Sequence, residues 1–264
     1  MKKILVLWLV VVALFSCSPY QKALKSEDVA VKFDMATLQY DKGKYNKAIR
    51  LFEQIAPSYR GKPQAERMFY LFSQAYYKTE QYYLAGYQFE NFASSYPKSE
   101  KLEEASFLSA KCYSKLSPVY SLDQTDTFKA ITKLQAFIDD FPNSENMAEA
   151  NAVLRILTDK VEKKVFENAK QYNTISDYKS ALVALDNFID EYPGTKFKED
   201  ALYYRLDSSY YLAINSVEAK MKERLQNAKT AYATLIKFNE NTKYKVKADE
   251  MLAKIETDLQ QHAK

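Results

Sequence analysis

Hydrophobic residues recur along this chain in a helical pattern that ends at a proline. The clearest copy lies at 82–97, where Phe89, Phe92 and Tyr96 follow an alanine by four, seven and eleven positions and Pro97 comes next. These intervals place the large side chains on one face of a helix with about 3.6 residues per turn. The proline ends the helix because it has no backbone N–H to donate. The pattern therefore predicts an amphipathic helix that packs one face against a neighbour.

The pattern starts at five alanines, with 37 to 51 residues from one start to the next: Ala48, Ala85, Ala130, Ala181 and Ala228. The middle three copies end in proline, whereas the first and last have Arg60 and Glu240 at that position. A period of this length is typical of repeats built from helix pairs that pack on their neighbours. We therefore predict an all-α helical-repeat solenoid of about five helix pairs, with almost no strand.

The segment before each copy supplies the partner helix. A small residue lies twelve positions before the start of a copy and an aromatic residue lies three positions before it, as in Ser73 with Tyr82 and Ala169 with Tyr178. Small residues allow two helices to approach closely, and aromatic residues fill the space around them. This spacing resembles the tetratricopeptide repeat. The resemblance implies one tetratricopeptide-like repeat domain at 27–258.

A second regularity after the prolines supports the repeat. Ala105, Ala150 and Ala201 each lie nine residues after the aromatic residue that precedes a proline, and each follows an acidic residue. Ala248 lies nine residues after Asn239, which supports a fifth repeat although no proline is present there.

Two segments depart from the repeat. Residues 114–127 contain proline, serine and aspartate and break the helical periodicity, so we expect a projecting loop there. Residues 145–172 contain no helix breaker and carry apolar residues at helical spacing, which predicts one helix of about seven turns. Such a helix would make the third and fourth repeats one rigid block.

The amino-terminal residues have the pattern of an export signal. Lys2 and Lys3 precede an apolar run at 4–15 that is too short to span a bilayer. The run leads into Leu-Phe-Ser and then Cys17, which resembles the lipoprotein box, where the cysteine becomes the lipid-modified first residue. We therefore predict a lipoprotein signal peptide at 1–16 and lipidation at Cys17. An ordinary secreted protein with a coincidental cysteine is the alternative.

Lipidation has consequences for location. Several acyl chains on Cys17 would anchor the protein effectively permanently, because each buried methylene contributes about 0.8 kcal/mol. Residues 17–26 would form a lipidated tether. The resemblance to lipoproteins implies the outer membrane, because no aspartate follows the cysteine, and we expect the periplasmic face.

Composition excludes several kinds of chemistry. The net charge of +4 is too small to indicate a nucleic-acid partner. The four glycines are isolated, so no glycine-rich phosphate loop is possible. The one histidine, His262, lies in a polar tail at 259–264, which excludes a histidine base, a catalytic triad and a multi-histidine metal site. We therefore predict no enzyme activity, no cofactor and no metal.

Two acidic pairs keep one enzymatic alternative open. Asp139-Asp140 and Asp190-Glu191 precede the prolines that end two helices, and paired carboxylates occur in hydrolases. A solvated helix face is the favoured interpretation.

The remaining cysteine, Cys112, has no partner for a disulfide once Cys17 is lipidated.

A repeat array binds ligands on its concave face, which in tetratricopeptide repeats comes from the first helix of each pair. Alignment on Ser73 predicts a peptide groove in the repeats at 27–112, with seven candidate residues: Phe33, Tyr40, Arg67, Tyr70, Gln74, Tyr77 and Lys78. Aromatic groups with one or two cations suit an extended peptide that carries aromatic side chains and a terminal carboxylate. Alternatively, the tyrosines form only the polar rim of the core. Tyr83 and Tyr87 are not required by the repeat spacing, so they are further candidates.

The leader, the lipoprotein cysteine, the five repeats and the loop at 123–126 together resemble the BamD family of lipoproteins of the outer-membrane β-barrel assembly machine. The stretches 51–57 and 82–89 are similar to its Bacteroidetes-type branch. The resemblance implies that the repeats at 27–112 receive the carboxy-terminal targeting strand of unfolded outer-membrane proteins. It also implies that 145–258 dock on the periplasmic POTRA domains of BamA. A repeat scaffold of the Tol-Pal or cell-division type is the alternative.

One contact implied by the family is missing from the sequence. A basic residue would be expected on the second helix of the fourth repeat, where Ala184 and Asp186 lie instead. The chemistry of this partner interface is therefore expected to differ.

Overall fold

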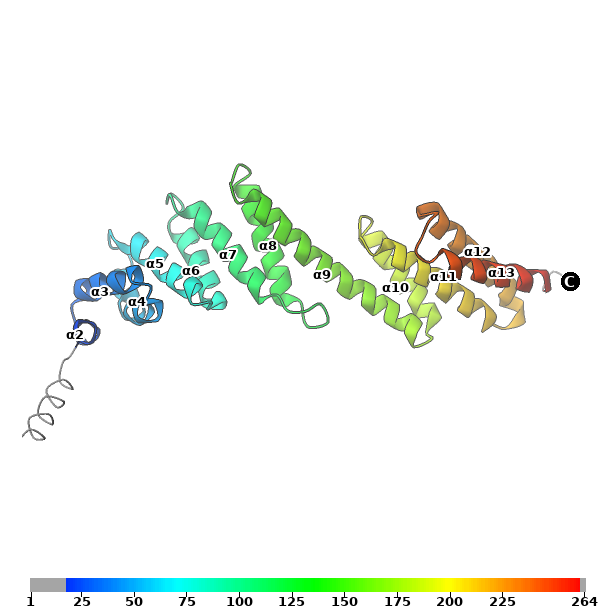
Figure 1. Cartoon of the computed structure of the whole chain (residues 1–264), viewed down its shortest axis with the longest axis horizontal. Helices are drawn as coiled ribbons and strands as arrows, with labels where there is room; N and C mark the ends of the chain where they lie inside the picture. The colour runs from blue at the N-terminus through cyan, green and yellow to red at the C-terminus, as the bar shows by residue number, and fades with distance from the viewer. Residues whose placement is uncertain (1–17, 262–264) are drawn as a thin grey trace, which may run out of the picture. The chain divides into compact units, whose positions relative to one another are not determined.

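The computed structural model describes residues 18–261, which form twelve helices and no strand (Figure 1). The helices are α2 Pro19–Lys25, α3 Val29–Asp41, α4 Tyr45–Tyr59, α5 Ala65–Lys78, α6 Tyr82–Ser95, α7 Leu102–Leu116, α8 Thr125–Asp140, α9 Met147–Thr174, α10 Tyr178–Glu191, α11 Lys198–Ile214, α12 Glu218–Phe238 and α13 Lys245–Gln261. The predicted all-α helical-repeat fold is confirmed. The predicted signal peptide at 1–16, Cys17 and His262 lie outside the described residues.

The described chain consists of two compact units. Unit 1 contains the residues up to 117 together with 125–154, and unit 2 contains 118–124 together with the residues from 155 onward. The boundary falls within α9, a single helix of 28 residues that matches the helix predicted at 145–172 to within two residues at each end. The domain limits expected from the sequence, including one repeat domain at 27–258, stay predictions.

In unit 1, the second helix of each pair carries the hydrophobic stripe that the pattern predicted. On α6, Phe89 and Phe92 are buried, and the helix ends at Ser95 just before Tyr96 and Pro97. Successive helices from α3 to α8 pack on one another (Figure 1), and the rings of Phe89 and Phe92 contact Tyr70 of α5, the first helix of the same pair. The pairs therefore stack as the repeat predicts.

One helix of unit 1 lies inside the predicted tether at 17–26. Ser18 caps α2 by accepting a hydrogen bond from the backbone N–H of Gln21 at 3.3 Å, and Pro19 occupies the first helical position. Tyr20 is buried, and Lys47 of α4 lies over its ring with Nζ 5.0 Å from the ring centre. This segment is therefore a packed helix rather than an extended chain.

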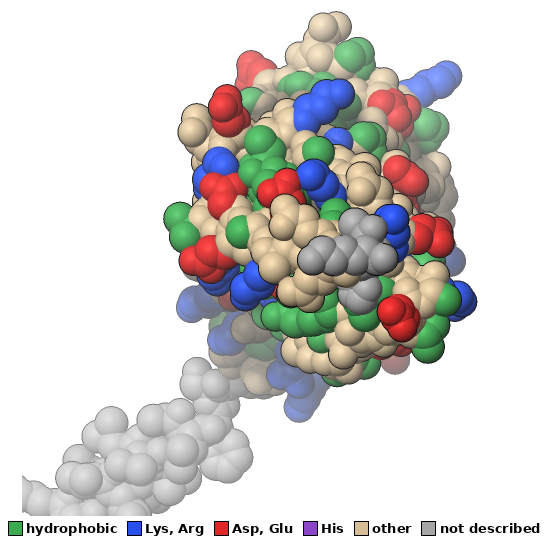
Figure 2. Space-filling model, turned by 90° about the vertical axis from the view of Figure 1, so that its right-hand side faces the viewer, with side chains coloured by type: hydrophobic (Ala, Val, Ile, Leu, Met, Phe, Trp, Pro, Cys, Tyr) green, Lys and Arg blue, Asp and Glu red, His purple; other side chains and the backbone are tan. Residues whose placement is uncertain are grey.

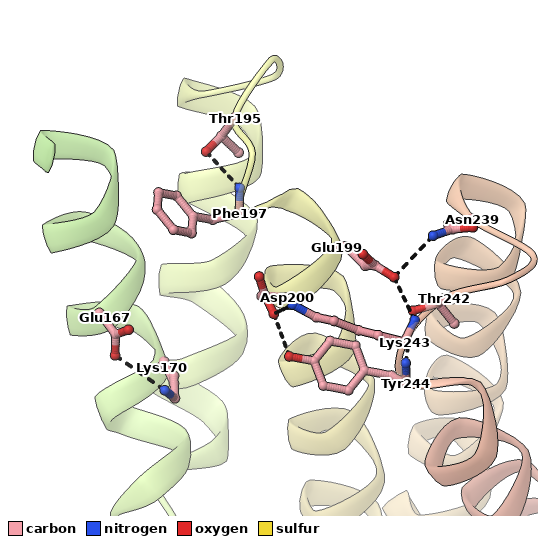
Figure 3. A network of polar contacts seen from close by, with 10 residues as sticks. All are labelled: Glu167, Lys170, Thr195, Phe197, Glu199, Asp200, Asn239, Thr242, Lys243 and Tyr244. Atoms are coloured by element: carbon pink, nitrogen blue, oxygen red, sulfur yellow. Dashed lines mark hydrogen bonds and ion pairs between the residues drawn. The ribbon is translucent and has the colours of Figure 1, made fainter. Parts of the chain in front are cut away.

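In unit 2, polar contacts at the turn before α13 connect it to α11 (Figure 3). Asp200 accepts a hydrogen bond from Tyr244 Oη at 2.5 Å and forms an ion pair with Lys243 Nζ, also at 2.5 Å. Glu199 accepts a hydrogen bond from the backbone N–H of Lys243 at 3.1 Å. The Tyr244 ring stacks on Tyr203 with ring centres 3.9 Å apart. The final helix pair is thus fixed by polar and aromatic contacts as well as by its apolar core.

The carboxy-terminal end of the molecule has a mixed surface. Figure 2 shows acidic, basic and apolar side chains interspersed over this face, without one charge type dominating it. The last turn of α13 extends into the predicted polar tail at 259–264 and ends at Gln261.

Candidate peptide-binding surface of unit 1

The candidate groove residues lie on α3 and α5, the first helices of the first two pairs, which contact each other. Tyr40, Tyr70 and Tyr77 are each partly buried, and Gln74 is buried at 8% exposure. Their rings rest on the core: Tyr70 lies 5.6 Å from Phe92 between ring centres. The tyrosines are thus held in place by packing, as a preorganised binding surface requires.

Gln74 is the centre of a polar cluster that joins α5 to α7. Its Nε2 donates to Tyr70 Oη at 2.9 Å and to Glu104 Oε1 at 3.3 Å. Lys101 Nζ lies 3.1 Å from Glu104 Oε2 and 5.4 Å from the centre of the Tyr70 ring. We call Tyr70, Gln74, Lys101 and Glu104 the Gln74 cluster.

The protonation states in the Gln74 cluster follow from its contacts. Burial raises the pKa of Tyr70, and its hydrogen bond to Glu104 raises it further. Burial opposes ionisation of Glu104, but hydrogen bonds with Tyr70 and Lys101 outweigh this effect and lower its pKa. At neutral pH the cluster therefore contains a neutral phenol beside a carboxylate–ammonium pair.

Tyr77 of α5 also has an aromatic contact, with the second helix of its own pair. The Tyr77 ring packs edge-on against Tyr82, with 6.1 Å between ring centres. Next along this face, Lys111 of α7 forms an ion pair with Glu149 at the start of α9, at 2.7 Å. The hydrogen bond that Lys111 donates to Glu149 raises the pKa of Lys111 against the effect of burial, and Tyr77 adds to the shift.

The other predicted groove residues do not converge on this surface. Phe33 is only 6% exposed and packs against Tyr59 at 5.3 Å, so it belongs to the core. Arg67 and Lys78 are exposed in the first and last turns of α5. They lie eleven positions apart along the helix, which is about 16 Å at 1.5 Å per residue. One terminal carboxylate can therefore contact only one of these two cations.

Four residues of this surface were not predicted from the repeat spacing: Lys101, Glu104, Lys111 and Glu149. Two of them carried a signal, because Glu104 and Glu149 are the acidic residues directly before the repeated alanines at 105 and 150. The third acidic residue of this series, Asp200, accepts a hydrogen bond from Tyr244 of unit 2, as described above. The acidic position before the alanine is therefore used for contacts between helix pairs.

A cavity of about 460 Å³ lies beside the turn between α4 and α5 and is closed on one side by α6. Phe69, Phe92 and Tyr96 provide its aromatic wall. Arg60 and Asn91, both exposed, provide a cation and an amide at its edge. This combination has the chemistry expected for a terminal carboxylate next to an aromatic side chain, at a place that the sequence did not predict.

The remaining candidates differ in exposure. Tyr83 and Tyr87 are 64% and 51% exposed on α6, so both are available for contacts.

Cys112 is fully buried, and burial raises the pKa of its thiol to about 12, which makes the thiol unreactive at neutral pH.

The acidic pairs that kept an enzymatic alternative open lie at the ends of two helices. The acidic pairs Asp139-Asp140 and Asp190-Glu191 are exposed at the ends of α8 and α10, as expected for solvated helix ends. Within 18–261, no three His, Cys, Asp or Glu side chains are grouped closely enough to hold a metal ion. None of the described helices combines the length and apolar character needed to cross a membrane.

These features define a class of protein: a helical-repeat array with an ordered aromatic and polar surface on its first helices. The chain belongs to the YfiO family of outer membrane lipoproteins, whose family model matches residues 26–173 and 158–263. The predicted resemblance to the BamD family is thereby confirmed.

One curated relative extends this result. The outer membrane protein assembly factor BamD of Caulobacter vibrioides is 23% identical to the chain over 180 residues. The aligned region covers 68% of this chain and 59% of the relative, so it spans less than two thirds of the relative's length.

Proposed function

We propose that this protein is a lipid-anchored scaffold of the outer-membrane β-barrel assembly complex. In this proposal the lipid on Cys17 holds it at the periplasmic face of the outer membrane. Unit 1 recruits unfolded outer-membrane proteins, and the region 145–258 docks on the POTRA domains of BamA. The protein acts by binding and performs no reaction. The observation that carries the proposal is the match to outer membrane lipoproteins along 26–263.

The surface of unit 1 supports substrate recruitment. The half-buried rings of Tyr40, Tyr70 and Tyr77 offer flat apolar contacts with polar tips, which suit an extended peptide with aromatic side chains. Tyrosine provides such contact area at a low cost in conformational entropy. The targeting strand would lie across these first helices.

The terminal carboxylate of the strand fits the Arg60 cavity better than α5. Arg60 has aromatic side chains beside it, whereas Arg67 and Lys78 are exposed at opposite ends of their helix. A guanidinium can bind a carboxylate through two parallel hydrogen bonds. We therefore assign the carboxylate to Arg60 and the preceding residues to the tyrosine surface.

Docking of BamA is proposed for 145–258. Asp186 occupies the region where the family would have a basic contact, and it accepts a hydrogen bond from Arg205 Nε at 2.5 Å. The cation paired with Asp186, Arg205, lies on α11. A partner carboxylate would have to compete with Asp186 for Arg205, which supports interface chemistry different from the family's.

Binding of the purified mature protein to the periplasmic domains of BamA from the same organism tests the scaffold role. We expect a saturable complex by isothermal titration calorimetry, and absence of any affinity would reject the proposal. Copurification of Tol-Pal or cell-division proteins, without BamA, would favour the alternative scaffold role.

The anchor needs its own test. Replacement of Cys17→Ser should abolish acyl labelling in cells and release the protein from membranes. A Cys17→Ser variant that still incorporates labelled fatty acid would contradict lipidation at this residue. The matched control is Cys112→Ser. This variant should keep its acyl label, because the buried thiol of Cys112 is not the acylated group.

A further inference from the structure

A groove in unit 2 lies between the loop at 118–124, α9 and the turn that precedes α11. Its volume is about 380 Å³, and it is lined by Val119, Tyr120, Ile156, Lys160, Lys163 and Lys196 among others. This volume falls in the range of about 300–1,000 Å³ that is usual for pockets that bind small molecules or side chains. The sequence predicted the loop but gave it no role.

The loop side of the groove is held in a defined conformation. Gln124 is buried at 4% exposure, and its Nε2 donates to the carbonyl oxygens of Val119 and Leu122, both at 2.9 Å. Lys164 Nζ of α9 donates to the same Leu122 carbonyl at 2.6 Å. The loop is therefore closed on itself by an amide side chain and fastened to α9.

Aliphatic side chains are exposed on both sides of the groove. Val119 on the loop and Ile156 on α9 are each 62% exposed, although the surrounding backbone is ordered. Phe197 adds an aromatic side chain from the turn before α11. Apolar side chains that gather in a recess of a solvent-exposed protein surface mark sites where a partner or ligand binds.

The edge of the groove is basic. Three lysines line it against one carboxylate, Asp159, which forms an ion pair with Lys196 at 2.6 Å. Lys163 Nζ lies 4.3 Å from the centre of the Tyr120 ring, a cation–π contact that orients its ammonium group. The lining residues therefore carry an excess of positive charge beside the exposed side chains of Val119 and Ile156.

We propose that this groove binds an acidic, aliphatic peptide segment of a protein partner. Aliphatic side chains would enter the recess beside Val119 and Ile156, and carboxylates would pair with Lys160 and Lys163 at its edge. A recess of this kind fits side chains of a peptide better than a flat lipid surface. This peptide site is separate from the proposed function, because the groove would bind an acidic, aliphatic peptide whether or not the protein binds BamA.

Fluorescence anisotropy with a labelled synthetic peptide of alternating Glu and Leu tests the site on the full mature protein. We expect binding to weaken about tenfold in the double variant Lys160→Glu/Lys163→Glu, because two attractive charge pairs are lost and the reversed charges add repulsion. Ile156→Ser should weaken binding several-fold. Lys254→Glu and Val246→Ser, exposed on α13 in the same unit, are the matched controls and should bind as the wild type does.

Three results would overturn the inference. The first is no binding of the peptide, or equal binding of a peptide with Lys in place of Glu. The second is unchanged affinity in both the lysine and the Ile156 variants. The third is binding to vesicles of anionic phospholipid that depends on these lysines while the peptide does not bind, which would assign the surface to a membrane. Far-ultraviolet circular dichroism confirms that each variant is folded.

Discussion

The hydroxyl of Tyr113 donates a hydrogen bond to Glu90 Oε2 at 2.9 Å and thereby joins α7 to α6. The same relationship occurs one repeat earlier, where Tyr76 donates to Glu53 Oε1 at 2.8 Å and joins α5 to α4. In both pairs the two residues are 23 positions apart. The bond therefore belongs to the repeat, and it connects the second helix of one pair to the first helix of the next.

Replacement of Tyr113→Phe tests the energetic value of this connection. We expect the free energy of unfolding to fall by about 1 kcal/mol, because the change removes one hydrogen bond to a carboxylate without leaving a cavity. Lys133 keeps Glu90 paired at 2.7 Å, which limits the loss. Urea unfolding followed by circular dichroism measures the effect. Tyr83→Phe, at an exposed tyrosine of α6, should leave stability unchanged.

Glu90 should also make stability depend on pH. Burial opposes its ionisation, but hydrogen bonds from Lys133 and Tyr113 outweigh burial and lower its pKa. A carboxyl whose pKa is lower in the folded state stabilises the fold above its unfolded pKa, and this contribution is lost as pH falls through the folded pKa. We therefore expect Glu90→Gln to lower stability at neutral pH and to flatten its decline in acid.

Urea unfolding across the acidic range measures this pH dependence. Glu100→Gln, at an exposed glutamate of the same unit, serves as the control and should follow the wild-type curve. A Glu90→Gln variant with the full acid-dependent loss of stability would contradict the assignment.

The fold could be predicted because its signal is local. The intervals from Ala85 to Phe89 and Phe92 are set within one helix, and the structure buries all three residues. The limits of the inserted loop were less accurate. The loop was expected at 114–127, but α7 continues to Leu116 and α8 begins at Thr125. Burial of Tyr113 and Thr127 at the two ends extends both helices, and this packing is not visible in local composition.

The candidate site could be predicted only in part because its partners are distant in sequence. Tyr70 and Gln74 lie one turn apart on α5, so their common face follows from helical geometry. Glu104 comes from 30 residues further along, and its approach depends on how α7 packs on the preceding pair. Phe33 was placed in the groove by alignment on Ser73. The structure instead packs Phe33 against Tyr59 of α4, a contact between residues 26 positions apart that an alignment within one helix does not reveal.

Gly86 lies in the repeat segment 82–97 where α6 packs tightly against α7. A Cβ atom at this position would lie 3.2 Å from Cys112 Cβ and 3.3 Å from the Tyr113 ring, and Ser109 Oγ already donates to the Gly86 carbonyl at 3.0 Å. Cys112 Cβ is fixed to its backbone, so the two helices must separate to accept a methyl group.

We expect Gly86→Ala to destabilise the protein by about 1 kcal/mol. Overpacking costs about 1–3 kcal/mol, whereas the higher helix propensity of alanine returns at most about 1 kcal/mol. Gly194→Ala is the control, because a Cβ there meets nothing within 4 Å. Urea unfolding of both variants distinguishes the effects, and a Gly86→Ala variant as stable as Gly194→Ala would show that the helices yield without cost.

Arg60 provides the sharpest test of how unit 1 would hold a targeting strand. A synthetic peptide that ends in phenylalanine with a free carboxylate should bind the wild type about tenfold more tightly than its carboxamide, because a charge-assisted hydrogen bond contributes roughly 1.5–3 kcal/mol. In Arg60→Ala this preference should disappear, and the two peptides should bind with equal affinity. Arg50→Ala, at an exposed arginine of α4, should keep the preference. Calorimetry with the paired peptides measures the charge contact separately from the aromatic contacts. If the preference survives in Arg60→Ala but is lost in Lys78→Ala or Arg67→Ala, the carboxylate binds at an end of α5, as the sequence pattern alone suggested.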